Sequence, residues 1–204
     1  MVTRLILLEV VRMDHRINQQ IEFIITLDKL KHIQRRSYLI SGDRTENSAE
    51  HSWHIALMAM LLAEYSNESI DLERTIRMLL VHDIVEIEAG DTYCYDSVVD
   101  QKLREEKAAD QLFGMLPDDQ AVMMRALWDE FEAGESPESR FAAAMDRLMP
   151  LLQSYHTQGK GWKENEISIS QVLERNGPVV DGSKSLWMYS EKLIEDAAEK
   201  GWLS

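Results

Sequence analysis

Helical spacing of apolar residues is the feature that most limits what this chain can fold into. Apolar side chains recur every three or four residues along most of its 204 positions. No stretch alternates between apolar and polar residues for long enough to predict a strand. Residues that interrupt helices are also scarce, because the chain has only 4 prolines and 9 glycines. The pattern predicts an all-α protein.

One helix start carries a capping box, a pair of side chains that bond to the free backbone amides of the first turn. Asn47 can accept a hydrogen bond from the amide of Glu50, and the Glu50 side chain can reach back to the amide of Asn47. We expect the helix to run from about 49 to 65. Its expected buried side chains are Trp53, Ala56, Leu57, Met60 and Leu61.

Glycine and proline mark two further helix boundaries. Ser136 can cap a helix whose first residue is Pro137, since proline fits the first helical turn. Gly90 ends the helix that contains the sequence MLLVHDIVEI. The expected helices lie at about 20–33, 49–65, 71–89, 101–115, 119–133, 137–155 and 183–200, with a short one near 168–175.

The length and the uniform composition indicate one folded domain. A chain of 204 residues is long enough for a sizeable core, and we find no internal repeat or low-complexity tract. We expect residues 1–20 to be a lead-in, either helical or poorly ordered, and residues 21–204 to form the domain.

Charge and cysteine content narrow the possible partners. The 22 basic and 36 acidic residues give a net charge of −14, which repels a nucleic-acid polymer but still permits a small phosphorylated ligand. The lone Cys94 cannot form an intramolecular disulfide and suits a reducing cytosol. The apolar stretch LILLEVV is too short to span a bilayer. We expect a cytoplasmic protein with no membrane partner.

Two histidines and two aspartates predict a metal site. His82 and Asp83 are adjacent in an apolar helical stretch, and Asp146 lies within the apolar run FAAAMDRLMPLL. Burying such a carboxylate is costly unless it is paired or bound to a cation. With His51, these residues would supply the mixed nitrogen and oxygen coordination that divalent transition ions accept.

Each of these residues also has an ordinary structural explanation. His54 is a rival to His51, because it lies one helical turn later on the same face. Asp146 could simply pair with Arg140 or Arg147. Taken together, however, four coordinating side chains at core-facing positions favour a metal site over four unrelated residues.

The order His51, His82-Asp83, Asp146 resembles the H…HD…D signature of the HD-domain metal-dependent phosphohydrolases. The surrounding sequences RTENSAEHSWH, HDIVEIEAGD and AAAMDRL are similar to the branch that contains the bacterial 5′-deoxynucleotidases and their HDDC-type relatives. The resemblance covers about residues 27–153, so that residues 154–204 would be a C-terminal helical extension.

The resemblance implies a single-domain helical bundle that holds one divalent metal ion through His51, His82, Asp83 and Asp146. Cobalt, manganese or another transition metal is expected, with magnesium and zinc as alternatives. It also implies that Glu86 acts as general acid or base, and the position of Glu86 in the sequence is consistent with this role. Glu86 follows Asp83 by three residues and His82 by four, so it shares their helical face.

Further residues are expected at the substrate. The resemblance gives Asp91 a place in the catalytic and substrate site, where the matching aspartate of the family helps to hold the sugar. A phosphate also needs a cation, and the resemblance favours Arg36, with Arg35 as its immediate rival. Ser37 stands where those deoxynucleotidases have a tryptophan that excludes ribonucleotides, so the sequence does not predict a preference for deoxyribose. Arg44 and Glu46 are expected to pair locally.

The sequence therefore predicts an enzyme that releases phosphate from a small phosphomonoester, foremost a nucleoside or deoxynucleoside 5′-monophosphate. One alternative is an HD-type hydrolase of a diphosphate, a cyclic nucleotide or an alarmone. Another is a regulatory domain that binds a metal or nucleotide without turnover. A homodimer is expected as well, because 11 methionines and 5 tryptophans leave apolar surface for self-association.

Overall fold

Helices make up most of the computed structural model, which describes residues 2–90 and 101–203, and the side chains of 14–90 and 102–203. The all-α prediction is confirmed. The α-helices of the described chain are α1 (Val2–Leu27), α2 (Ser48–Leu62), α3 (Leu72–Val81), α4 (Glu86–Ala89), α5 (Gln101–Phe113), α6 (Asp118–Ala133), α7 (Pro137–His156), α8 (Lys160–Glu164), α9 (Ile169–Asn176), α10 (Val179–Gly182) and α11 (Lys184–Glu199). Short 3₁₀ helices are η1 (Asp28–His32), η2 (Ala63–Tyr65) and η3 (His82–Val85).

A small antiparallel hairpin precedes α2, and the sequence did not predict it. Strand β1 (Gln34–Tyr38) pairs with β2 (Thr45–Asn47), so that Gln34 lies opposite Asn47 and Tyr38 lies opposite Thr45. The register shifts between these pairs. Strands this short and this polar show no alternation of apolar residues, which is the pattern that predicts a strand. The hairpin holds the segment between η1 and α2 in place.

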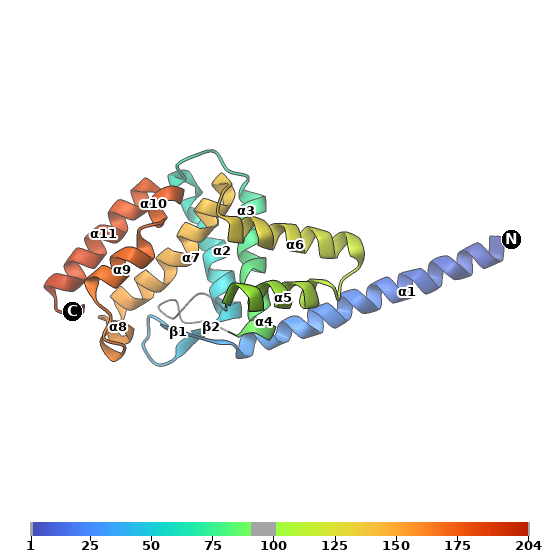
Figure 1. Cartoon of the computed structure of the whole chain (residues 1–204), viewed down its shortest axis with the longest axis horizontal. Helices are drawn as coiled ribbons and strands as arrows, with labels where there is room; N and C mark the ends of the chain where they lie inside the picture. The colour runs from blue at the N-terminus through green and yellow to red at the C-terminus, as the bar shows by residue number, and fades with distance from the viewer. Residues whose placement is uncertain (1, 91–100, 204) are drawn as a thin grey trace.

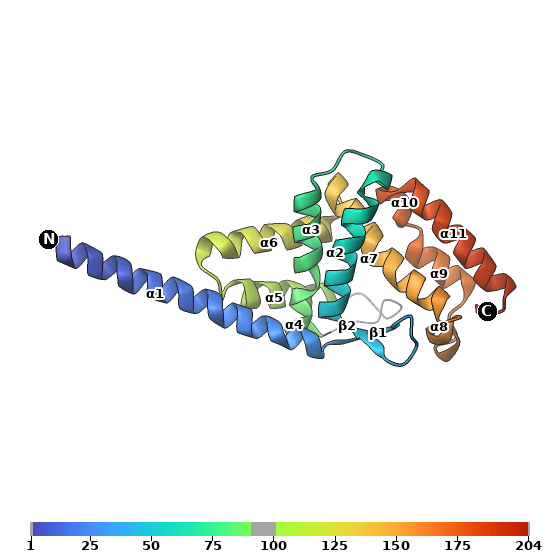
Figure 2. The same cartoon turned by 180° about the vertical axis from the view of Figure 1, so that it is seen from behind.

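Helix α1 is continuous through the segment expected to be a lead-in. It begins at Val2 rather than near 20 and ends at Leu27, where η1 follows. Figures 1 and 2 show its N-terminal part extending well beyond the other helices. Among the described residues, no helix has both the length and the apolar composition that crossing a membrane requires.

The local capping predictions hold. Asn47 and Glu50 form the expected capping box at the start of α2. Ser136 caps α7, and Pro137 is its first residue. Gly90 ends α4 with a φ of 79°, a conformation that side-chain-bearing residues rarely adopt.

The predicted buried face of α2 was wrong. Of the expected residues only Ala56 is buried, whereas Trp53 is 60% exposed and Leu61 is 76% exposed, with Leu57 and Met60 also at the surface. Apolar residues surround this helix on all sides, so periodicity did not select one face. The buried face instead carries polar and smaller residues, namely Ser48, His51, Ser52, Ile55, Ala56, Met58 and Ala59.

Two apolar clusters form the core, and α3 contributes to both. One cluster packs α2 and α7 against α11 and includes Ile55, Phe141 and Ile194. The other packs α3, α5 and α6 around Phe113 and Trp128. Trp162 is buried, and Phe131 and Trp187 pack against the core.

A close approach holds α10 against α7. A side chain on Gly182 would collide with the backbone carbonyl of Arg140, so only glycine permits this packing. Helix α7 is thereby held between α2, α3 and α10, which are its main neighbours. This arrangement brings the middle of α7 to the ends of α2 and α3 where the candidate site lies.

Candidate metal centre

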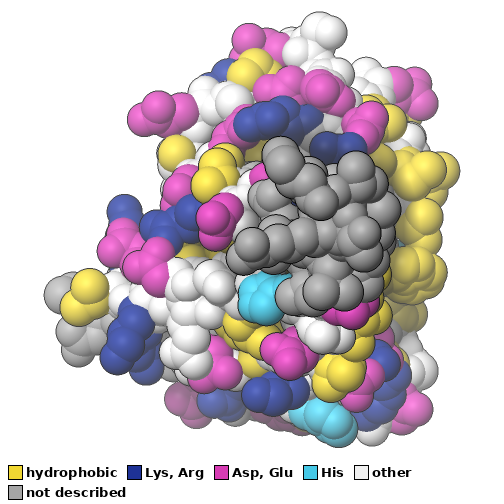
Figure 3. All heavy atoms as spheres, turned by 90° about the vertical axis from the view of Figure 1, so that its right-hand side faces the viewer, with side chains coloured by type: hydrophobic (Ala, Val, Ile, Leu, Met, Phe, Trp, Pro, Cys, Tyr) yellow, Lys and Arg dark blue, Asp and Glu magenta, His cyan; other side chains and the backbone are white. Residues whose placement is uncertain are grey.

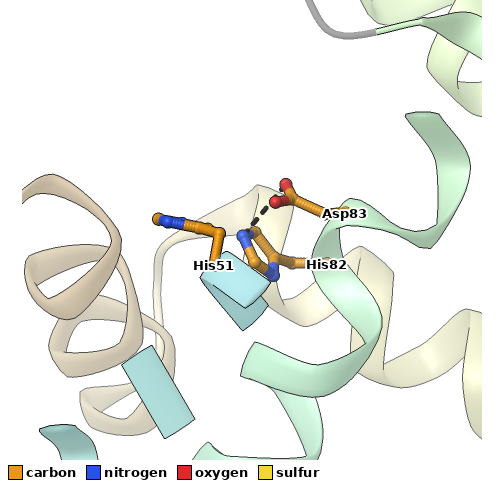
Figure 4. A group of neighbouring side chains, drawn as sticks. All are labelled: His51, His82 and Asp83. Carbon is orange, nitrogen blue, oxygen red and sulfur yellow. Dashed lines mark ion pairs between the residues drawn. The ribbon is translucent and has the colours of Figure 1, made fainter. Parts of the chain in front are cut away.

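The four predicted ligand side chains meet between α2, η3 and α7. His51 Nε2 lies 3.0 Å from Asp146 Oδ1, and His82 Nε2 lies 3.0 Å from Asp83 Oδ1 and 3.8 Å from Asp146 Oδ1. One ligand atom each from His51, His82 and Asp83 fall within 4.8 Å of one another. All four residues are buried. Figure 4 shows His51, His82 and Asp83 side by side, with the His82–Asp83 ion pair drawn as a dashed line.

The remaining nitrogen of each imidazole contacts an oxygen of the protein. His51 Nδ1 lies 3.1 Å from Glu46 Oε2, and His82 Nδ1 lies 2.8 Å from the carbonyl oxygen of Leu79. Both contacts favour a proton on Nδ1, which leaves the Nε2 lone pair for a cation. Metal-binding histidines usually make such a second contact, because it fixes the tautomer and the ring orientation.

The donor atoms present fit a metal ion. His82 Nε2 is buried and has no hydrogen-bond partner of acceptable geometry among the described residues, although Asp83 is near. Buried polar atoms are seldom left in this state. Two imidazoles and two carboxylates also form the mixed donor set that divalent transition ions accept. The orphaned nitrogen therefore points at the position where a cation would satisfy it.

A change of helix type orients His82 and Asp83, two of the four candidate ligands. The helix that begins at Leu72 tightens into the 3₁₀ segment η3 at His82, whereas the sequence predicted an uninterrupted helix. Side chains three residues apart eclipse in such a segment. The side chains of Asp83 and Glu86 accordingly point in the same direction. Both contact the same guanidinium nitrogen, because Arg35 Nη1 lies 2.6 Å from Asp83 Oδ2 and 3.6 Å from Glu86 Oε1.

Asp146 comes from the middle of α7, where the helix contains Pro150. Proline has no amide hydrogen and cannot bond to the carbonyl four residues earlier, which is that of Asp146. The series of backbone hydrogen bonds in α7 is thus interrupted at Asp146, the candidate ligand itself. Neither arginine considered as a simple partner explains Asp146, because Arg140 pairs with Glu68 and Arg147 donates to the carbonyl of Ala143.

The protonation of the cluster follows from its charges. Burial lowers the pKa of His82, but the neighbouring carboxylates of Asp83 and Asp146 outweigh it and raise the pKa to about 10. Burial raises the pKa of Asp83, yet His82 and Arg35 bring it down to about 2. Burial raises the pKa of Asp146, but the neighbouring imidazoles of His51 and His82 and the guanidinium of Arg175 hold it well below its usual value.

Of the two candidate phosphate-binding arginines, Arg35 lies at the cluster. Its Nη1 is 2.6 Å from Asp83 Oδ2, and its Nη2 is 3.8 Å from Asp146 Oδ1. Arg36, the residue favoured by the sequence, is exposed. The two side chains alternate along β1, so a shift of one residue exchanges their faces.

Two other predicted features can be placed, whereas Asp91 lies outside the described residues. His54 is only partly buried and stacks beside Trp53 rather than joining the cluster. The expected Arg44–Glu46 pair was wrong, because Arg44 forms a bidentate pair with Glu50.

Three residues near the centre were missed by the sequence reasoning. Glu46 is 1% exposed and holds His51. Ser48 donates a 2.5 Å hydrogen bond to Glu86 Oε2. Arg175 places Nη2 3.6 Å from Asp146 Oδ2. Glu46 could have been inferred from its place five residues before the predicted ligand His51, whereas Arg175 follows Asp146 by 29 positions and had no signal.

A comparison with known families identifies the family of the chain. The family model described as HD domain matches residues 27–187. The chain belongs to the HD domain family. The match begins where the sequence resemblance began and extends past 153 into the C-terminal helices.

The HD domain relatives include several proteins named 5′-deoxynucleotidase. The human 5′-deoxynucleotidase HDDC2 is 28% identical over 143 residues, which cover 69% of each chain. The Enterobacter 5′-deoxynucleotidase Ent638_2835 is 32% identical over 163 residues, 75% of this chain and 81% of its own. Among solved structures, a predicted metal-dependent phosphohydrolase from Magnetospirillum magnetotacticum MS-1 is 48% identical, with a TM-score of 0.90 over 93% of this chain and 96% of that one.

Proposed function

We propose that this HD domain protein is a metal-dependent phosphohydrolase that releases phosphate from a nucleoside or deoxynucleoside 5′-monophosphate. The observation that carries the proposal is the convergence of His51, His82, Asp83 and Asp146, with an orphaned imidazole nitrogen inside the group. The names of the relatives support the substrate class, because several are 5′-deoxynucleotidases.

One divalent ion is the expected cofactor, and those four side chains would hold it. Such an ion would polarise a phosphoryl oxygen and lower the pKa of a water molecule. Cobalt and manganese are the favoured metals, and magnesium or zinc are alternatives. Within the described chain, no second group of histidine, cysteine and acidic residues has atoms close enough to bind another ion.

Glu86 is the proposed general acid or base. It is buried beside Asp83, and the hydroxyl of Ser48 fixes its Oε2 at 2.5 Å. The other oxygen, Oε1, lies 3.6 Å from Arg35. A carboxylate held in this way keeps one orientation while it takes a proton from the attacking water or gives one to the leaving alkoxide.

Arg35 is the proposed phosphate-binding residue in place of Arg36. Its side chain is 13% exposed and lies among the carboxylates of Asp83, Glu86 and Asp146. Its planar guanidinium can give two parallel hydrogen bonds to a phosphate. If Arg35 binds the phosphate, the position directly after the phosphate-binding arginine is Arg36 rather than Ser37. Neither Arg36 nor Ser37 is the aromatic residue expected there in a deoxyribose-selective enzyme. Asp91 stays a proposal for the sugar.

A panel of phosphate compounds tests the substrate class. Purified protein supplied with Mn²⁺ or Co²⁺ should release phosphate from ribo- and deoxyribonucleoside 5′-monophosphates. Turnover confined to diphosphates, cyclic nucleotides or alarmones would replace the substrate but keep the metal centre. If no compound were turned over while nucleotides still bound with equal affinity to wild type and Glu86→Gln, a non-catalytic regulatory domain would be the better account.

We also propose that the protein is a cytoplasmic homodimer. Helix α2 exposes an apolar stripe formed by Trp53, Leu57, Met60 and Leu61. Figure 3 shows hydrophobic side chains gathered along its right-hand edge, on the side where Figure 2 shows α2 in front. Large exposed apolar patches mark association surfaces. Helix α1 also projects away from the other helices, and a second copy packing on it would supply the contacts that an isolated helix lacks.

A further inference from the structure

A second arginine, Arg175, lies at the edge of the candidate metal centre. It is in the last turn of α9, a helix that packs against α7. Its Nη2 is 3.6 Å from Asp146 Oδ2, while Arg35 Nη2 is 3.8 Å from Asp146 Oδ1. The two guanidinium groups therefore approach different oxygens of one carboxylate, one from β1 and the other from α9.

The donors of Arg175 are not committed to another group of the described protein. Its ion pair with Asp146 is longer than a hydrogen bond, and within the described chain its guanidinium makes no hydrogen bond. By contrast, Arg44 and Arg140 each donate to a carboxylate at 2.8 Å or less. Arg175 is also 26% exposed, twice the value of Arg35, so an entering ligand can reach it.

The charge balance of the centre requires a second cation. Four buried carboxylates surround the two histidines, those of Glu46, Asp83, Glu86 and Asp146. A divalent ion and Arg35 leave one of these negative charges uncompensated, and that excess would repel a phosphate dianion in a site of low dielectric. The charge of Arg175 removes the excess. Its side chain is also 26% exposed, so it is accessible to an incoming phosphate.

We propose that Arg175 binds the phosphate group of the substrate together with Arg35, so that two guanidinium groups from β1 and α9 hold the phosphate over the metal centre. This inference rests on the proposed phosphohydrolase function and adds a substrate-binding residue to it. A residue with this role contributes to ground-state binding of substrate and of the phosphate product. It is not needed to retain the metal.

Phosphate binding measured without turnover tests the assignment. Inorganic phosphate would be titrated by calorimetry into the Mn²⁺-loaded wild type, Arg175→Gln and Arg175→Lys proteins, and the metal content of each would be determined. Arg77→Gln is a matched control, because Arg77 pairs with Glu73 on the exposed surface of α3. The KM and kcat for a nucleoside 5′-monophosphate would be measured on the same four proteins.

The expected result is a phosphate Kd and a KM raised about tenfold or more in Arg175→Gln, since a hydrogen bond to a charged group is lost. The metal content and the control should match wild type, and Arg175→Lys should recover part of the affinity through its charge. An unchanged phosphate affinity in Arg175→Gln overturns the inference. The inference is also overturned if Arg175→Gln loses its metal but binds phosphate with normal affinity once the metal is reloaded. A wild type that binds phosphate through Arg175 yet hydrolyses no monoester contradicts the proposed function alone.

Discussion

His51 Nε2 lies 3.0 Å from Asp146 Oδ1, although the two residues are 95 positions apart in the sequence. The other ring nitrogen of His51 faces a second carboxylate, that of Glu46. A lone pair on Nε2 and a carboxylate oxygen repel each other unless a proton or a metal cation lies between them. The contact between α2 and α7 thus brings together two groups that a cation would stabilise.

Glu46→Gln should weaken metal binding without unfolding the protein. Glutamine can still accept the hydrogen bond from His51 Nδ1, but the negative charge that makes the imidazole a stronger donor to metal is lost. Partners of this kind change metal affinity by about 10- to 100-fold. Competition with a metal-sensitive dye would measure the change. Glu73→Gln, at an exposed carboxylate on α3, is the control, and equal affinities in all three proteins would contradict the role given to Glu46.

Glu86→Gln should lower kcat while leaving the metal in place. Loss of a general acid or base typically costs about 10²- to 10⁴-fold in rate. Ser48→Ala should have a smaller effect in the same direction, because it removes only the hydroxyl that orients Glu86 Oε2. Steady-state phosphate release and metal analysis of both variants check this order. A Glu86→Gln enzyme with wild-type kcat would remove Glu86 from the proposed mechanism.

Metal uptake should release protons. The pKa of His82 is raised to about 10 in the metal-free protein, mainly because the carboxylates of Asp83 and Asp146 outweigh burial. The imidazole therefore carries a proton near neutral pH, and a metal ligand must give it up. Apparent metal affinity should rise as the pH increases towards 10. Calorimetry in two buffers with different heats of ionisation would measure the protons released, and heats independent of the buffer would contradict the prediction.

The same pKa shift gives a sign for the stability of the metal-free protein. Because the folded pKa of His82 lies above its ordinary value of 6.5, its protonated form stabilises the fold fully below pH 6.5. That contribution is lost as the pH rises through 10. Thermal melts of the metal-free protein should show a lower Tm at pH 9 than at pH 6.5, whereas His82→Gln should lose this part of the pH dependence.

Leu61→Glu should dissociate the proposed homodimer. Leu61 is 76% exposed on the apolar stripe of α2, so a charge there costs the monomer little but would be buried in a dimer. Light scattering across a concentration series would report the molar mass. Leu103→Glu on α5, where Leu103 is 71% exposed, is the matched control. A wild type that stays monomeric at all concentrations would contradict the dimer.

Much of the helical framework could be predicted from local chemistry. The caps at Asn47 and Ser136 and the stop at Gly90 depend on residues within one turn, and all three hold. The burial of α2 could not be predicted in the same way. Its two faces are both apolar, and the choice between them depends on His51 and Ser48 contacting residues from distant helices.

The candidate site could likewise be predicted only in part. The residue types and order of His51, His82, Asp83 and Asp146 led to the expectation that they meet, and the fold brings them together. Their binding of a metal stays a prediction. The choice between Arg35 and Arg36 depends on which face of a five-residue strand turns inward, and a single-residue shift reverses it.

The most direct test of the metal centre is phosphate release from a nucleoside 5′-monophosphate before and after metal removal. Protein stripped with a chelator and freed of it should release no phosphate, and added Mn²⁺ or Co²⁺ should restore the activity. Asp146→Asn treated in the same way should recover little of it, because one of the four proposed ligands is weakened. Full phosphate release by a thoroughly stripped wild-type sample would contradict the account.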